Sequence, residues 1–600
     1  MTICTQTKKI IIFGREINWP KIFSIPGGKW PNRRRWRQLP KILTFRQRWL
    51  TRGLFLLIVV SVILLAINFA LSHTYLQPKV GGDYREGLVG QPRYINPVLS
   101  AINDADRDLV QLIYSSLFKY DNQGILIPDL AESYSVEDDG LTYNISLKKD
   151  VFWHDGEPLT ANDVVFTVKT IQNPEYQSPL RSIWQNVEVE KVDNHQLIFK
   201  IKTVYAPFLH NLTFGILPRH IWSGISGGNF LLAEYNLKPI GSGPYKFEKF
   251  SKTAKNGRIE SIELVRNERY YLTAANEPAG PFIEKIVLYF YNSEDGLIEA
   301  YQKRRIDGLA SVSRNNLPLL KDSFILHQIK LPLYYAVFFN QTKSKALTDK
   351  TARLALAYAT NKQALLEQVL DNKGTVVDSP LLPGCLGYSE EIKIYEFALE
   401  HANNILEEAG WIDQDEDGIR EKKIKDELTK LEINLVASDW PEIKQTAEML
   451  KEQWEKIGAQ VNLEIVDSIT LQRDYLKPRQ YDALLFGQAL AADPDPFAFW
   501  HSSHSKDPGL NLALYQNKDV DKLLEEARQN LDEGKRAEQY LEFQKLVTDD
   551  LPAVFLFSPD YLYSVNKKVK GISETEKLPT QTQRFSQIEN WYIKTNRFWR

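Results

Sequence analysis

Two short patterns in the sequence contain residue types that could do chemistry, and the first is a candidate nucleophile. Residues 224–228 read GISGG and match the G-x-S-x-G pattern of serine hydrolases, with Ser226 at the centre. In those enzymes the serine stands on a sharp turn directly after a strand, which exposes its hydroxyl group. Residues 218–222, which precede the pattern, do not form an apolar strand. We therefore expect a loop here and predict that the protein is not an enzyme.

The second pattern is an acidic segment that could hold a metal ion. Residues 413–418 read DQDEDG, with Asp413, Asp415 and Asp417 at the first, third and fifth positions of a calcium-type loop and a glycine at the sixth. Ile424 stands where such a loop has its bidentate glutamate, whereas Glu421 at the ninth position could be a ligand. The sequence therefore predicts a weak calcium site at most, and the alternative is a solvated turn.

The other histidines and cysteines give no stronger site. His501 and His504 could share one helical face, but no third ligand stands near them. Cys4 and Cys385 form no disulfide framework. The chain also lacks a P-loop, an H-E-x-x-H pattern and a dinucleotide-binding glycine pattern. We therefore predict no cofactor and no metal beyond the weak calcium site.

The size and charge of the chain limit the kind of protein that presents these residues. A chain of 600 residues is too long for one hydrophobic core, so we expect two or more lobes. The formal net charge of −2 hides an asymmetry, because residues 1–53 hold 13 Lys and Arg against one acid, Glu16. A basic arm before an acidic body indicates two compartments. It argues against a nucleic-acid-binding protein, which carries its positive charge on the folded domain.

An apolar segment follows the basic arm. Residues 54–71 read LFLLIVVSVILLAINFAL and contain no charge, and a helix of this length spans about 27 Å, enough to cross a hydrocarbon core. The positive-inside rule places the basic side in the cytoplasm. We predict a cytoplasmic arm at 1–53 and a transmembrane signal anchor at 54–72, with the main domain in the periplasm or at the cell surface. The alternative is a cleaved signal peptide, because residues 70–72 resemble a cleavage site.

The body of the chain alternates strand and helix patterns. Leu431, Ile433 and Leu435 alternate as in a strand, and apolar residues then recur at helical spacing through residues 443–457. Residues 461–465 alternate again, which completes a βαβ unit with parallel strands. Residues 160–163 read TAND and predict a helix N-terminus with a capping box. The sequence therefore predicts an α/β body with mixed sheets.

Several longer segments resemble one known family in the order expected for it. They are Asn96-Pro97, YSSLF at 114–118, PDLAESY at 128–134, FWHDGEPLTANDV at 152–164, GSGPY at 241–245, RLALAYA at 353–359, AGW at 409–411, DPDP at 493–496, WHS at 500–502 and LPAVFL at 551–556. Over residues 81–575 the chain resembles the extracellular solute-binding proteins of family 5, the dipeptide- and oligopeptide-binding type.

The resemblance implies a fold and a function. It implies a two-lobed periplasmic-binding-protein-like fold of type II whose lobes close on a ligand, and a monomeric subunit of an ABC importer that captures peptides for a membrane permease. The implied boundaries are 81–117, 206–330 and 557–600 for the first lobe, 118–205 for a subdomain inserted in it, and 331–556 for the second lobe. Binding would shift the hinge equilibrium toward the closed form.

The resemblance also implies cleft residues, with one departure. In the dipeptide- and oligopeptide-binding members an acid three residues before an Asp-Pro pairs with the α-ammonium of the peptide. Here that position is Leu490 or Ala492, neither of which can do so, and Asp493 or Asp495 could substitute. The candidate ligand-binding residues are Tyr94, Asn96, Asn340, Trp440, Phe486, Gln488, Asp493 and Trp500.

Two alternatives to peptide import stay open at this point. The same fold could bind an oligosaccharide, a nickel chelate or an opine, and His501 and His504 would then be needed for the chelate. The chain could also be an anchored sensor or chaperone-like module that signals through its closed form without transport.

Overall fold

The computed structural model describes residues 10–12, 15–17, 44–254, 257–274, 280–573 and 576–599. Cys4 and most of the predicted basic arm at 1–53 lie outside these residues. The chain divides into two compact units: residues 78–596 form one, and the N-terminal segment together with residues 597–600 forms the other.

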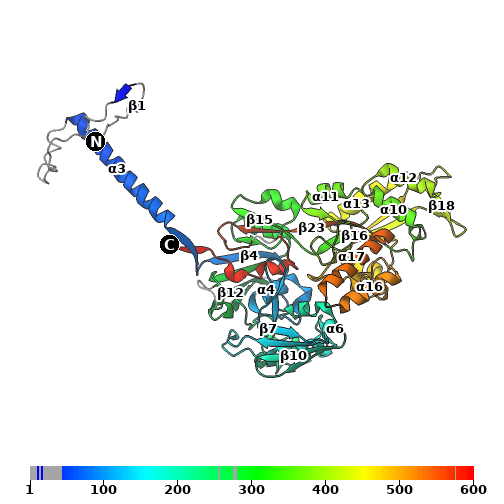
Figure 1. Ribbon diagram of the computed structural model, residues 1–600, viewed down its shortest axis with the longest axis horizontal. Coiled ribbons are helices and arrows are strands. Elements are labelled where there is room, and N and C mark those ends of the chain that lie inside the picture. The colour runs from blue at the N-terminus through cyan, green and yellow to red at the C-terminus, as the bar shows by residue number, and fades with distance from the viewer. Residues whose placement is uncertain are drawn as a thin grey trace, which may run out of the picture. The chain divides into compact units, whose positions relative to one another are not determined.

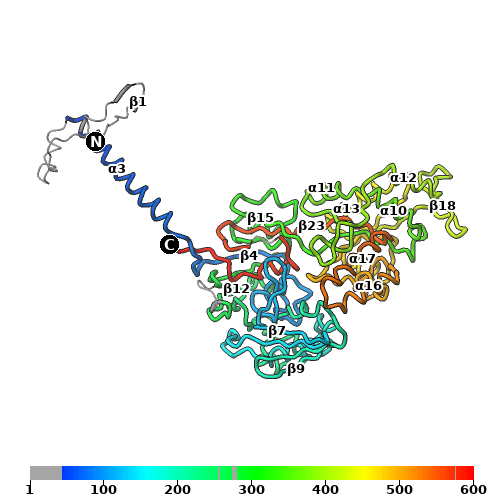
Figure 2. Tube along the Cα trace, viewed as in Figure 1, coloured from blue at the N-terminus to red at the C-terminus, as the bar shows by residue number. Residues whose placement is uncertain are grey.

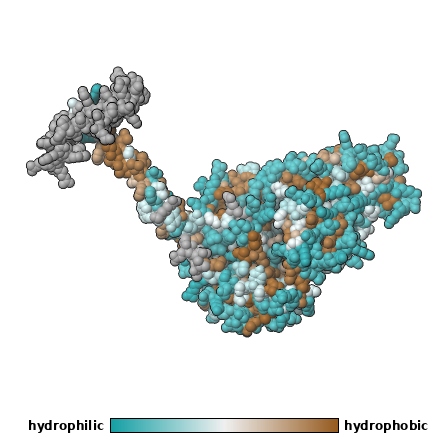
Figure 3. All heavy atoms as spheres, viewed as in Figure 1, coloured by the Kyte–Doolittle hydropathy of each residue, from teal (hydrophilic) through white to brown (hydrophobic). Residues whose placement is uncertain are grey.

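The N-terminal unit contains the predicted apolar helix. Helix α3 (Phe45–Ser72) includes the whole predicted segment at 54–72, and its part from Arg48 to Ser72 is long and apolar enough to cross a membrane. Its side chains are exposed, and the apolar stretch is visible as a brown segment in Figure 3. No other helix among the described residues meets the same test. Strand β3 (Thr74–Lys79) follows and pairs with β24 (Lys594–Trp599).

The large unit is built on one long mixed sheet. Its strands run in the order β11-β12-β13-β4-β14-β23-β16-β22-β20-β21, and β15 and β17 also pair with β23. The bounds are Tyr245–Lys252 for β11, Ile259–Arg266 for β12, Lys285–Tyr291 for β13, Asp83–Val89 for β4, Gly308–Leu309 for β14, Ala553–Asn566 for β23, Leu333–Phe339 for β16, Ala483–Ala489 for β22, Glu432–Ser438 for β20, Gln460–Val466 for β21, Phe324–Lys330 for β15 and Gly374–Val376 for β17.

Strand β23 links two lobes. Its first half pairs with β16 and β17, and its second half, from Asp560 onward, pairs with β15 and β14. The apolar core divides at the same place. One buried cluster takes its side chains from residues 84–329 and 561–591, and two others take theirs from residues 334–557 only. We call these the first and second lobes. The predicted two-lobed α/β fold is confirmed, and the chain crosses between the lobes at β15–β16 and within β23 (Figures 1 and 2).

The first lobe carries a separate four-stranded sheet in the order β7-β8-β10-β9 (Ala131–Val136, Thr142–Leu147, Gln196–Ile201 and Val187–Lys191). It lies within the predicted insertion at 118–205 and is drawn in cyan in Figure 1. Helix α5 (Ala161–Gln172) belongs to it and begins at the predicted capping box, where the Thr160 backbone N–H donates to Asp163 (2.8 Å). The exact lobe boundaries remain a prediction, supported by this sheet and by the division of the core.

The second lobe contains the predicted βαβ unit. Strand β20 pairs in parallel with β21, and helix α13 (Pro441–Glu455) connects them. Ile443, Ala447, Leu450 and Trp454 on one face of α13 are buried, as their helical spacing predicts. Helices α16 (Lys518–Gln529) and α17 (Glu533–Asp550) then form an antiparallel pair before β23 begins. Both helices matter for the site, because Arg528 of α16 and Arg536 of α17 pair with the acids of the DPDP segment.

Candidate functional site

A small cavity lies where the two lobes meet. It encloses about 120 Å³, and both lobes and both crossing segments supply its walls. We call it the interlobe cavity. Its lining residues are Gln123, Gly124, Lys330, Leu331, Pro332, Thr375, Val377, Leu382, Pro383, Gly384, Cys385, Ala492, Ser558, Lys577, Leu578 and Pro579. A ligand held here would touch both lobes at once, which is the arrangement that couples binding to closure.

The charge in this cavity has one sign. Two of its lining residues, Lys330 and Lys577, are cationic, and none of the lining residues is Asp or Glu. Lys577, on the first lobe, donates a hydrogen bond from Nζ to the Pro383 carbonyl of the second lobe (2.9 Å). Ala492 is one of the two positions at which the resemblance implies an ammonium-binding acid, and it lines the cavity as a methyl group. The cavity is therefore suited to an anionic group.

The lobes also meet at Asp493, just outside this cavity. Asp493 lies 2.5 Å from the Arg536 guanidinium of α17 and 3.7 Å from Nε2 of His210 on the first lobe. Burial raises the pKa of the Asp493 carboxyl, and Arg536 opposes that rise. Burial also lowers the pKa of His210, and Asp493 opposes that change. Asp493 is thus already neutralised within its own lobe.

Asp495 makes a second contact between the lobes. The Tyr205 hydroxyl of the first lobe donates to its Oδ2 atom (3.1 Å), and Arg528 Nε of α16 lies 3.1 Å from the same carboxylate oxygen. The Arg528 guanidinium lies 5.2 Å from the Tyr205 ring centroid and 4.2 Å from that of Phe497, within the range of cation–π attraction. These contacts join the two lobes in the described structure.

A third interlobe contact lies near the crossing strands. Arg314 of the first lobe donates to the carbonyls of Leu370 and Lys373 (both 3.1 Å) and lies 3.5 Å from Glu442 at the start of α13. Burial lowers the pKa of the Arg314 guanidinium, and Glu442 opposes that change. The lobes therefore contact each other near the crossing strands as well as around Asp493 and Asp495.

A larger cavity of about 300 Å³ lies within the first lobe alone. It contains Lys119, which is 3.2 Å from Glu589 and 3.8 Å from Asp129. It also reaches His210, so it adjoins the Asp493 contact. Because every lining residue belongs to the first lobe, a ligand confined here would not bridge the lobes. The smaller interlobe cavity is the better candidate despite its size.

Comparison with known proteins decides the family. A model of the bacterial extracellular solute-binding proteins, family 5, matches residues 126–509. The chain belongs to this family. The prediction made from its motifs is confirmed.

Other members of the family cover most of the chain. The oligopeptide-binding protein AppA of Bacillus subtilis is 30% identical over 525 residues, which is 86% of this chain and 92% of that protein. The structure of AppA in complex with a nonapeptide has a TM-score of 0.67 at 28% identity and covers 86% of this chain and all of that one. The structure of NikZ from Campylobacter jejuni in complex with Ni(L-His) has the same TM-score at 26% identity, with 85% of this chain and 99% of that one covered.

Three of the predicted ligand-binding residues are polar and make hydrogen bonds within their own lobe. The Asn96 amide donates to Asn236 (3.1 Å) and accepts from the Val98 N–H (3.0 Å). Asn340 donates to a backbone carbonyl of the second lobe (3.1 Å), and Gln488 accepts from a buried tyrosine hydroxyl. All three are at most 2% exposed. These groups fix local turns and strands, and their predicted ligand contact is not tested by the structure.

The aromatic candidates are spread over the molecule. Trp500 is 1% exposed in the core of the second lobe, against Phe555, and Phe486 packs on the same core. Tyr94 packs on the first-lobe core, where the backbone N–H groups of Arg93 and Tyr94 bond to Asp106. Trp440 is 57% exposed at the start of α13. Of the eight predicted residues, Asp493 is the one that the structure places in a contact between the lobes.

Sequence reasoning missed the residues that join the lobes. They are Tyr205, His210, Arg314, Arg528 and Lys577, and Arg536 supports them by pairing with Asp493 within the second lobe. None stands in a motif. The one signal that pointed toward them is the pair of acids in Asp-Pro-Asp-Pro, since buried acids require partners.

Ser226 does not stand where a hydrolase nucleophile would. It is exposed and precedes the short helix α8 (Gly227–Phe230), and the element before it is another short helix, α7 (Arg219–Trp222). Residues 223–226 form the expected loop, whereas Gly227 and Gly228 begin α8, and no strand leads into the serine.

Proposed function

We propose that this chain is the peptide-capturing subunit of an ABC importer. Its family and the oligopeptide-binding protein AppA named above support this function, and so does the dipeptide-binding protein of Escherichia coli K12, which is 26% identical over 474 residues. The observation that carries the proposal is the interlobe cavity, whose walls come from both lobes and both crossing segments. A cavity of this kind exists only in the closed form, so its ligand stabilises closure.

Closure is the signal that a permease reads in this proposal. In the ligand-free chain the open and closed forms exchange, and a ligand that contacts both lobes favours the closed form by its differential affinity. The contacts of Asp493 and Asp495 with the first lobe join the two lobes. A membrane partner that contacts both lobes at once would recognise the closed form only.

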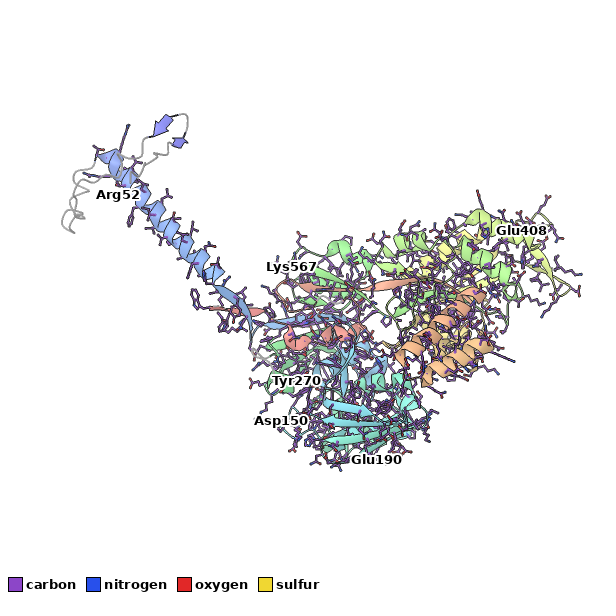
Figure 4. The ribbon with its side chains drawn as sticks, in the orientation of Figure 1. Arg52, Asp150, Glu190, Tyr270, Glu408 and Lys567 are labelled. Carbon is purple, nitrogen blue, oxygen red and sulfur yellow. The ribbon has the colours of Figure 1, made fainter. Side chains whose placement is uncertain are left out.

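Helix α3 supplies the anchor in this proposal. The basic residues on its N-terminal side remain in the cytoplasm, and the two lobes face outward as a monomer. Figure 4 marks Arg52 among the basic residues at the N-terminal end of α3. Retention of this helix keeps the binding protein close to its permease without a lipid.

We further propose that the peptide is held mainly by its carboxylate. Lys330 and Lys577 are the cations of the interlobe cavity, whereas Asp493 and Asp495 are paired with Arg536 and Arg528. An ammonium–carboxylate hydrogen bond contributes about 1.5–3 kcal/mol, so loss of one partner weakens binding by about tenfold or more. The remaining backbone would be held as an added strand.

The test uses the purified full-length chain in detergent. Thermal unfolding is followed with pooled short peptides, pooled oligosaccharides and nickel–histidine chelate, and only the peptides are expected to raise Tm. A ligand at one hundred times its Kd stabilises the folded state by about 2.7 kcal/mol, a shift of a few degrees for a domain of this size. A shift with oligosaccharides or nickel chelate alone would reject peptide capture, and no shift with any pool would favour the sensor function.

The carboxylate proposal is tested with end-blocked forms of one peptide that binds. Carboxyl-terminal amidation is expected to weaken binding about tenfold, and amino-terminal acetylation to change it less than about twofold. Lys577→Met should remove the effect of amidation. Tight binding of the amidated peptide together with loss of binding on acetylation would show that the amine is recognised instead.

A further inference from the structure

The acidic loop predicted from DQDEDG lies in the second lobe, away from the interlobe cavity. It follows helix α12 (Leu399–Glu408), whose last residue, Glu408, is labelled in Figure 4. The backbones of Ile412 and Glu421 exchange two N–H···O bonds (3.1 and 3.0 Å) and close the base of the loop. Strand β18 (Glu421–Ile424) then turns back as β19 (Glu427–Lys430). The loop is therefore held at its base while its acidic side chains converge.

Three carboxylates of this loop meet at one point. One oxygen each from Asp413, Asp415 and Glu421 lies within 4.8 Å of the other two. Calcium binds oxygens at about 2.3–2.6 Å, so oxygens up to about 5 Å apart can share one ion. Asp417, the third acid of the predicted set, is not in this group. Its carboxylate accepts from the Ile419 N–H (2.9 Å) and from Lys430.

Glu421 gives an independent indication of a ligand. Its side chain is 1% exposed, and its Oε1 atom accepts from the Gln414 N–H (2.8 Å). Its Oε2 atom is buried and has no hydrogen-bond partner. A buried carboxylate oxygen without a partner is costly, and such an atom in a native fold usually indicates an ion or a water. A cation among the three carboxylates removes this cost.

The two nearby cationic side chains, Lys430 and Arg420, do not neutralise all three carboxylates. Lys430 Nζ lies 3.3 Å from Asp415 and bonds to Asp417, but all three side chains are more than a third exposed. Exposed ion pairs of this kind contribute little, and a divalent ion can displace the flexible lysine. Arg420 instead bonds to Glu407 (3.0 Å) and to backbone carbonyls behind the loop. Lys430 therefore pairs with one of the three convergent carboxylates, Asp415, and Arg420 pairs with Glu407 outside the group.

We propose that Asp413, Asp415 and Glu421 bind one calcium ion. The ligands are all hard oxygens, and the chain spacing places them at the first, third and ninth positions of a loop with glycine at the sixth. Backbone carbonyls and waters complete the coordination. The ion fastens the end of α12 to the β18–β19 hairpin, and it plays no part in ligand capture at the interlobe cavity.

The experiment is calcium titration of the full-length chain in detergent after treatment with EDTA. Isothermal titration calorimetry with CaCl₂ is expected to show one ion per chain with a Kd of about 0.1–1 mM, the range of extracellular calcium modules. Saturating calcium should raise Tm by about two degrees or more, and MgCl₂ should bind at least about tenfold more weakly because it demands octahedral geometry. No saturable heat and no Tm shift up to about 10 mM CaCl₂ would overturn the proposal.

Matched variants distinguish a specific calcium site from nonspecific attraction of calcium by the acidic loop. Glu421→Gln and Asp415→Asn should each weaken calcium binding about tenfold or more, whereas Glu416→Gln, an exposed acid of the same loop outside the triad, should change it less than about twofold. In EDTA the Glu421→Gln chain should unfold at the same or a higher temperature, because a buried amide carries a smaller desolvation penalty. Equal weakening by all three variants would overturn the site. Should Glu421→Gln fail to fold, the exposed Asp415→Asn decides.

Discussion

The hydrogen bond between Tyr205 and Asp495 is the clearest single contact that holds the lobes together. The hydroxyl belongs to the first lobe and the carboxylate to the second, and they are separated by 290 residues of chain. Tyr205→Phe removes the hydroxyl and keeps the ring on which the Arg528 guanidinium stacks. The substitution therefore perturbs closure without disturbing either core.

The expected size of the effect follows from the contact. A hydrogen bond to an ionised acceptor contributes about 1.5–3 kcal/mol. The Asp495 side chain is 13% exposed and keeps its pairing with Arg528, so we use the lower limit. About 1.4 kcal/mol corresponds to a tenfold change in an equilibrium constant, so the open:closed ratio should rise about tenfold. Where the free chain is mostly open, the apparent Kd of any closure-dependent ligand rises by the same factor.

The assay is single-molecule fluorescence energy transfer across the two lobes. Dyes are placed at Lys200→Cys on β10 and Lys522→Cys on α16, both exposed, in a chain that also carries Cys4→Ser and Cys385→Ser. The ratio of open to closed molecules is measured without ligand, so the result does not depend on peptide identity. Tyr134→Phe is the matched control, because Tyr134 is 46% exposed on β7 of the same inserted sheet.

Two results would refute this reasoning. An open:closed ratio that changes less than about twofold in Tyr205→Phe would show that the hydrogen bond does not hold the lobes closed. An equal change in Tyr134→Phe would show that the effect is general to the subdomain.

Three other predictions concern stability. His154 accepts a hydrogen bond from the Gly241 N–H (3.2 Å), and burial lowers its pKa to about 4. Because the unfolded pKa is about 6.5, burial of the neutral imidazole leaves the free energy of unfolding unaffected by its titration above pH 6.5. Protonation should lower the free energy of unfolding by about 3 kcal/mol as the pH drops to 4, as measured by urea unfolding. The variant His154→Gln should lose this pH dependence. Gly241→Ala should destabilise by about 3 kcal/mol, because its Cβ would lie 2.0 Å from the Ile113 carbonyl oxygen, whereas Gly228→Ala, in open space, should not. Arg353→Lys should lower the free energy of unfolding by about 2 kcal/mol in the same assay. The buried guanidinium donates to three backbone carbonyls at 2.8–3.0 Å, and one ammonium group cannot reach all of them together.

Local signals in the sequence predicted the elements well. The βαβ unit from β20 to β21 was found because its apolar spacing changes from two to about four residues and back. The start of α5 was found because a capping box is a contact between residues three apart. The GSGPY segment was recognised only as a family motif. The structure gives its physical reason, since Gly241 and Gly243 pass so close to Ile113 that no side chain fits.

The contacts that join the lobes could not be predicted from the sequence, because they are not local. Arg536 meets Asp493 across 43 residues, and Tyr205 meets Asp495 across 290. The family motifs make Trp500 a candidate for the cleft, and in the structure its side chain packs in the core of the second lobe. Sequence type does not separate an aromatic that packs from one that binds, because both uses favour the same large apolar ring.

The arrangement of charge at the lobe contact also bears on which end of a peptide is recognised. For Asp493 to bind a peptide ammonium, Arg536 must first release it, and both side chains are nearly buried, at 12% and 5% exposure. Breaking a buried ion pair costs about 3–5 kcal/mol, whereas a new charge-assisted hydrogen bond returns about 1.5–3 kcal/mol. The exchange is unfavourable, and Ala492 offers no acid within the cavity itself. The cations there are Lys330 and Lys577, and the proposed recognition of the peptide carboxylate leaves the Asp493–Arg536 and Asp495–Arg528 pairs of the second lobe intact.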